Sequence, residues 1–218
     1  MGTANQIRRS AVVSILVVTC SFASGGAQAA EADPRMLIKK MTEYISSQAS
    51  ISASIDSDIE VVTPELQKIQ FASSSRLQLS RPDKLRVERK GGYADVDLVF
   101  DGRALWVNDR QAKTYAQIDT PGTIDQLIER LRSEFSVDAP GADLLLGNAF
   151  DVLTDDIVDA KYIGEGVIGG IECDHLAVRD RETDWQIWIE RGEKPIPRKY
   201  VITSKAVTGA PQYTLILR

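Results

Sequence analysis

Residues 96–107 read VDLVFDGRALWV, and this stretch decides the fold of the chain. Apolar residues fill every second position on both sides of an Asp-Gly pair: Val96, Leu98, Phe100, Leu105 and Val107. A two-residue apolar period predicts a strand with one buried face, and Asp-Gly is a strong signal for a tight hairpin turn. The stretch is therefore predicted to form an antiparallel hairpin.

The same period continues on both sides of this hairpin. Turn residues such as Pro82-Asp83 and Gly91-Gly92 separate the apolar runs. Six successive strands are predicted, at residues 51–56, 69–80, 85–88, 96–100, 105–107 and 115–118. Consecutive strands joined by short turns predict an antiparallel meander.

Helices are predicted before and after the meander. Asp33-Pro34 is typical of a helix start, and this helix is expected to end near Ser50. Thr123 and Gln126 fit a capping box at the start of a second helix. The second helix is expected to bury one apolar stripe, which consists of Ile124, Leu127, Ile128, Leu131 and Phe135. A short, very apolar helix is expected at 144–146.

Strand-like runs return in the last third of the chain. They lie at residues 159–169, 171–180, 184–191, 197–204 and 212–218. The prediction is one α+β domain over residues 30–218, with a large curved antiparallel sheet of about eleven strands, an open half-barrel. The apolar run 213–217 ends the sequence without a polar tail, which is compatible with a longer natural chain.

The first 29 residues predict where the protein works. Arg8 and Arg9 precede the apolar run 11–23, and Ala27-Gln28-Ala29 ends the segment with small residues. This is the order of a cleaved secretory signal peptide. We expect export to the periplasm with cleavage after Ala29; a lipoprotein anchored at Cys20 is the alternative.

Composition argues against two kinds of partner and against a disulfide. The net charge is −5, and it becomes more negative when Arg8 and Arg9 are removed, which argues against nucleic acid and anionic lipid headgroups as partners. Cys173 is the one cysteine left after the signal peptide, so no internal disulfide is expected. We expect a monomer in which Cys173 is a buried, inert thiol.

Residues 98–107 also carry a resemblance to a known family. They are preceded by a helix and a long meander, and followed by helices and the run 188–202 with Pro195 and Pro197. This order resembles the LolA and LolB type of periplasmic lipoprotein carriers. It resembles more closely a family of predicted bacterial periplasmic proteins within that superfamily. The resemblance implies an open half-barrel in which helices form a lid over an apolar cavity, and the carriers bind acyl chains there.

The candidate ligand-binding residues come from the apolar positions that this fold would turn inward. They are Phe71, Leu77, Leu85, Leu98, Phe100, Trp106, Leu127, Leu131 and Leu144. Catalysis is not expected, because His175 is the one histidine and its neighbour Asp174 points to the opposite face of a strand. Neither a metal site nor a cofactor is predicted, since Cys173 and His175 are two ligands at most.

Two functions remain open at this level. The first is a non-catalytic periplasmic binding module with an apolar cavity for lipid or an acylated protein. The second is a protein-interaction or sensor domain of the envelope, with a filled core and an envelope protein as its partner. They differ in whether the helices leave room on the concave face of the sheet.

Overall fold

A computed structural model describes residues 32–137 and 139–218, which belong to one compact unit. The helices are α1 (Pro34–Ser47), α2 (Ile124–Ser133), the 3₁₀ helix η1 (Ala142–Leu145) and α3 (Ala149–Thr154). The strands of the first meander are β1 (Ser50–Val62), β2 (Lys68–Ser80), β3 (Lys84–Gly91), β4 (Asp95–Phe100), β5 (Ala104–Asp109) and β6 (Thr114–Asp119). Those of the second are β7 (Asp159–Ile168), β8 (Ile171–Arg179), β9 (Thr183–Glu190), β10 (Pro197–Ser204) and β11 (Gln212–Leu217).

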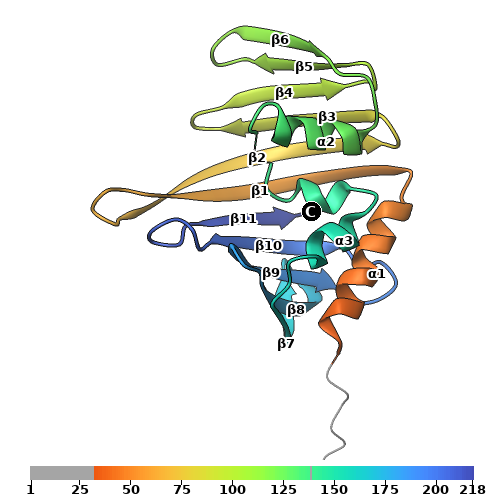
Figure 1. Ribbon diagram of the computed structural model, residues 1–218, viewed down its shortest axis with the longest axis vertical. Helices are drawn as coiled ribbons and strands as arrows, with labels where there is room; N and C mark the ends of the chain where they lie inside the picture. The colour runs from red at the N-terminus through yellow and green to blue at the C-terminus, as the bar shows by residue number, and fades with distance from the viewer. Residues whose placement is uncertain (1–31, 138) are drawn as a thin grey trace, which may run out of the picture. The chain divides into compact units, whose positions relative to one another are not determined.

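All eleven strands join in one antiparallel sheet, which is open (Figure 1). Its order is β6-β5-β4-β3-β2-β1-β11-β10-β9-β8-β7, so β6 and β7 are the two edges. β1 and β11 join the two meanders, with Ile55 opposite Leu217 and Ile59 opposite Tyr213. The predicted α+β fold with an open antiparallel sheet of eleven strands is confirmed.

The helices begin where the capping residues predicted. The Asp33 side chain accepts a hydrogen bond from the Arg35 amide at the start of α1, and Thr123 and Gln126 form a complete capping box at α2. α1 ends at Ser47, three residues earlier than expected. The prediction that Phe135 belongs to the stripe of α2 is wrong, because the helix ends at Ser133 and the Phe135 side chain is exposed.

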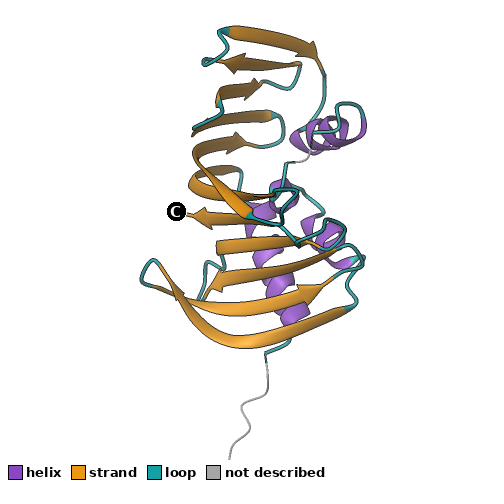
Figure 2. Cartoon of the chain, turned by 90° about the vertical axis from the view of Figure 1, so that its left-hand side faces the viewer, coloured by secondary structure: helices purple, strands orange, loops and turns teal. Residues whose placement is uncertain are grey.

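One face of the sheet, here called the inner face, carries two clusters of buried apolar residues. The first cluster joins β8–β11 to α1, η1 and α3, and includes Ile38, Met41 and Ile187. The second joins β2–β5 to α2 and the start of α3, and includes Phe100 and Leu127. Figure 2 shows the helices beside the strands on that side. The opposite face is here called the outer face.

Strand register explains why the second cluster is continuous. Leu79 lies opposite Leu85, Leu85 opposite Phe100, and Phe100 opposite Leu105. Neighbouring strands lie about 4.8 Å apart, so these four side chains form one apolar row across four strands. α2 covers this row.

Candidate ligand-binding surface

The structure brings most of the predicted ligand-binding residues together. Six belong to or pack against the second cluster: Leu77, Leu85, Leu98, Phe100, Leu127 and Leu131. Leu144 of η1 lies in the first cluster. Phe71 is half-buried on the inner face of β2, farther from α2, and belongs to neither cluster.

Trp106 lies on the outer face, so the prediction that it lines the inner face is wrong. Its neighbours along β5, Leu105 and Val107, contact the second cluster, and successive side chains of a strand point to opposite faces. Trp106 is paired with Val99 of β4 and Gln117 of β6. It is therefore not brought together with the other predicted residues.

Side chains fill the space between the helices and the inner face at the two clusters. Leu85, Phe100 and Leu127 are each no more than 8% exposed. One hollow of about 330 Å³ is open and lies over β2–β4. Outer-face side chains line most of it, among them Gln78, Lys84 and Arg86. No residue of α2 lines this hollow.

The inner face is apolar again where no helix covers it. β1 and β2 have 13 residues each, whereas β3 has eight and β4 six, and Figure 1 shows their hairpin extending beyond the helices. Ile59 is opposite Phe71, and Val61 is opposite Ile69. The exposed fractions are 39% for Ile59, 46% for Val61 and 39% for Ile69.

An aromatic contact borders this uncovered surface. The rings of Phe71 and Tyr93 meet edge to face with their centroids 5.0 Å apart, and Tyr93 is largely exposed. We call Ile59, Val61, Ile69, Phe71 and Tyr93 the hairpin patch. Contiguous exposed apolar side chains on a folded protein often mark a binding surface.

A polar group separates the hairpin patch from the second cluster. The buried hydroxyl groups of Ser57 and Ser73 lie 2.8 Å apart on paired positions of β1 and β2. Arg89 of β3 donates from Nε to Ser73 Oγ over 3.1 Å. The inner face therefore changes from apolar to polar and back to apolar along β2.

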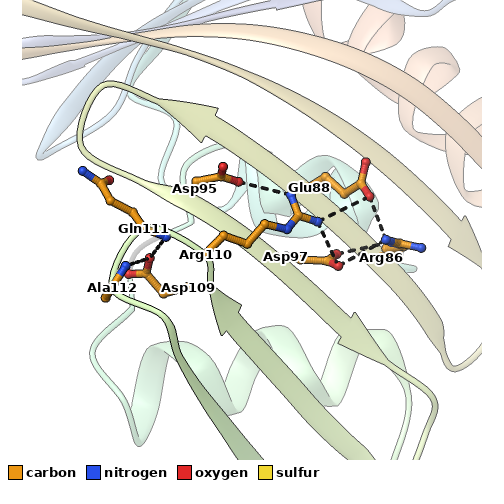
Figure 3. Close-up of polar contacts among 8 residues, drawn as sticks. All are labelled: Arg86, Glu88, Asp95, Asp97, Asp109, Arg110, Gln111 and Ala112. Carbon is orange, nitrogen blue, oxygen red and sulfur yellow. Dashed lines mark hydrogen bonds and ion pairs between the residues drawn. The ribbon is translucent and has the colours of Figure 1, made fainter.

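The outer face of β3–β5 is charged instead. Arg86 contacts Glu88 at 2.7 Å and Asp97 at 3.1 Å, while Arg110 contacts Asp95 at 3.1 Å and Asp97 at 3.3 Å (Figure 3). Each exposed ion pair contributes little to the stability of the fold, although a shared carboxylate such as that of Asp97 links the pairs into a network. These charges satisfy one another, so they form a solvated surface rather than a site.

His175 and Asp174 lie on opposite faces of β8, as predicted. His175 stacks on Trp188 with ring centroids 4.0 Å apart and its Nε2 lies 3.0 Å from Gln186 Oε1, while Asp174 accepts from the Tyr162 hydroxyl. Burial lowers the pKa of His175. Among the described residues, no group of three His, Cys, Asp or Glu side chains could hold a metal ion.

Cys173 is buried, as expected, and burial raises the pKa of its thiol. The thiolate is the reactive form, and this environment disfavours it. We therefore expect a thiol reagent to label Cys173 only as the protein unfolds, which mass spectrometry with and without denaturant measures in protein lacking residues 1–29. Rapid labelling of the native protein would contradict the buried position.

The sequence matches a known protein family over almost all of the described residues. The family model, described as "Predicted periplasmic protein (DUF2092)", matches residues 35–218. The chain belongs to this family. Membership in DUF2092 confirms the predicted family and agrees with the periplasmic location expected from the first residues. None of the curated proteins matches the chain.

Several solved structures resemble this DUF2092 protein in fold. The Pseudomonas aeruginosa MucA/MucB complex has 14% identity and a TM-score of 0.45 over 85% of this chain and 56% of that chain. The Mycobacterium tuberculosis lipoprotein LppX has 10% identity and a TM-score of 0.48, and the match covers 86% of this chain and 95% of LppX. LprF from Mycobacterium bovis has 8% identity and a TM-score of 0.47, and the match covers 86% of this chain and 93% of LprF. The DUF2092 chain thus spans just over half of the first of these, and such low identities say nothing of a shared ligand.

The predictions for the start of the chain lie outside the described residues. The signal peptide, its cleavage after Ala29 and the lipoprotein alternative at Cys20 all fall in residues 1–31, so they stay predictions. Within residues 32–137 and 139–218, no helix is long and apolar enough to cross a membrane.

Sequence reasoning missed part of the hairpin patch. Ile59 and Val61 were not predicted because the first strand was expected to end at Asp56, whereas β1 continues to Val62. The alternation of Ile55, Ile59 and Val61 with polar residues was a usable signal. Arg89 was missed because charged side chains are normally placed on a solvated face.

Proposed function

We propose that this protein is a non-catalytic periplasmic binding module that holds an apolar chain, from a lipid or an acylated protein, on the inner face of its sheet. The hairpin patch carries the proposal. Its side chains are apolar again beyond the Ser57–Ser73 pair and stay exposed to water, which costs free energy unless a ligand covers them. An apolar chain bound there would bury this surface.

The helices supply the second part of the proposal. α2 and η1 cover the row of Leu79, Leu85 and Phe100, and α2 contacts it through one amphipathic face. We propose that these helices act as a lid. When they lift, Leu127, Leu131 and Leu144 move away with the helices, and the ligand takes their place against Leu77, Leu98 and Phe71. The inner face of β2 would then expose Leu77 and Leu79 on one side of Ser73 and Phe71 on the other.

Lipid extraction and probe binding test this function. Protein purified from a bacterial periplasm is extracted with organic solvent and analysed by mass spectrometry, and a fluorescent fatty acid is titrated into the delipidated protein. Phe71→Ser should weaken probe binding by about 10- to 100-fold, because burial of a phenyl ring contributes about 1.5–3 kcal/mol. Tyr115→Ser, an exposed aromatic position on the edge strand β6, is the matched control and should bind as the unchanged protein does.

A filled core favours the second candidate function, a protein-interaction or sensor domain. The buried side chains of both clusters already contact one another. If no lipid is extracted, the probe does not bind, and Phe71→Ser changes nothing, the lipid-binding proposal is wrong. An envelope protein would then be the partner to seek.

A further inference from the structure

Arg89 is a charged residue on the inner face of the sheet, between the second cluster and the hairpin patch. It shares the inner face of β3 with Leu85 and Val87, and it lies opposite Ser75 on β2 and Val96 on β4. Arg89 is exposed, so water solvates its charge. Its guanidinium is therefore a cation that a ligand on the inner face can reach.

The hydrogen bonds of Arg89 leave most of its donors free. Nε donates to Ser73 Oγ, and Ser73 is held in turn by Ser57. Among the described residues, no carboxylate lies within 4.0 Å of Arg89, whereas Arg86 and Arg110 on the outer face each contact two or more. The Ser73 contact orients the guanidinium, and its Nη groups are left to bind an anion.

The surroundings of Arg89 define what kind of anion fits. Ile69 is four positions before Ser73 on β2, which is a distance of about 14 Å at 3.4 Å per residue. Phe71, Ile59 and Val61 lie within that distance on the same face. An anion with a long apolar tail can therefore place its head at Arg89 and its tail over the hairpin patch. A guanidinium binds a carboxylate through two parallel hydrogen bonds.

We propose that the ligand is a single-chain amphiphile with a carboxylate head, bound by Arg89, and that its tail covers the hairpin patch. This rests on the proposed function, since it names the chemistry of the ligand that the inner face binds. The lid need not open for this mode, because the hairpin patch lies beyond α2.

Paired ligands test the role of the head group. Hexadecanoate and hexadecanol, which share a tail, displace a neutral fluorescent probe from the full chain. Hexadecanoate should bind about tenfold more tightly, as expected for one charge-assisted contact. Arg89→Gln should remove this preference and leave hexadecanol binding unchanged, while Arg89→Lys should keep part of it. Arg76→Gln, an exposed arginine on the outer face of β2, is the matched control and should keep the full preference.

The outcomes separate this inference from the proposed function. If both ligands bind equally well to the unchanged protein, or if Arg89→Gln weakens both equally, the head-group role is wrong and the binding module stands. If neither ligand binds, both proposals fail. Sedimentation with phosphatidylglycerol vesicles adds a further arm, and binding to vesicles without binding of either ligand would make the hairpin patch a membrane-docking surface and overturn the inference.

Discussion

Phe100→Ala should lower the free energy of unfolding by about 3–5 kcal/mol, which urea denaturation followed by tryptophan fluorescence measures. Phe100 is 2% exposed and lies between Leu85 and Leu105 in the row that α2 covers. Truncation removes the apolar contacts of the ring and leaves a cavity that its neighbours on rigid strands can fill only in part. This loss is a large part of the stability of an ordinary domain.

Val99 provides the control for this prediction. It is the preceding residue of β4, half-buried on the outer face opposite Trp106. Val99→Ala should cost no more than about 1 kcal/mol, because its side chain is not enclosed by a helix. If Phe100→Ala and Val99→Ala both lower the free energy of unfolding by no more than about 1 kcal/mol, the inner face of β4 is not packed as the structure shows.

Local patterns predicted the elements of this fold well. The alternation in 96–107 and the Asp101-Gly102 turn predicted β4 and β5, because the period of a strand shows directly which side chains share a face. The capping residues Asp33 and Thr123 predicted the helix starts, since each side chain bonds a backbone amide of its own first turn. Such signals depend on near neighbours in the chain.

The errors arose where near neighbours are not sufficient. β1 extends past Asp56 because it pairs with β2 on one side and β11 on the other, and this pairing outweighs the polar residues Asp58 and Glu60. Trp106 is a different kind of error, because it was listed as an apolar inward position although the alternation of Leu105 and Val107 assigns it to the other face. A large aromatic residue on a strand is not by itself evidence for the buried side.

The candidate site was predictable only in part for the same reason. Leu77, Leu85 and Phe100 were found because they are apolar and in register. The boundary between the covered and uncovered inner face depends on where α2 lies relative to the sheet, and no local pattern contains that information. Arg89 follows Leu85 and Val87 at the strand period, so its inward position could have been derived from alternation.

The last prediction concerns α2. Leu127 is 2% exposed in the second cluster, and Leu127→Ala should cost about 2–5 kcal/mol in unfolding free energy. Leu131, one turn later, is only partly buried, so Leu131→Ala should cost less. If α2 is a lid, loosening its contact with the sheet also lowers the cost of opening. Affinity for a fatty-acid probe should then increase, by about tenfold for each 1.4 kcal/mol by which the closed state is weakened.

A matched variant separates a lid from an ordinary core helix. Leu176 of β8 is as buried as Leu127 but lies in the first cluster, away from α2. Leu176→Ala should destabilise the protein by a similar amount without tightening probe binding, because it weakens the fold and not the contact that α2 must break. If Leu127→Ala and Leu176→Ala change the affinity equally, the gain reflects general loosening and α2 is not a lid. If only Leu127→Ala tightens binding, the helix competes with the ligand for the row of Leu79, Leu85 and Phe100.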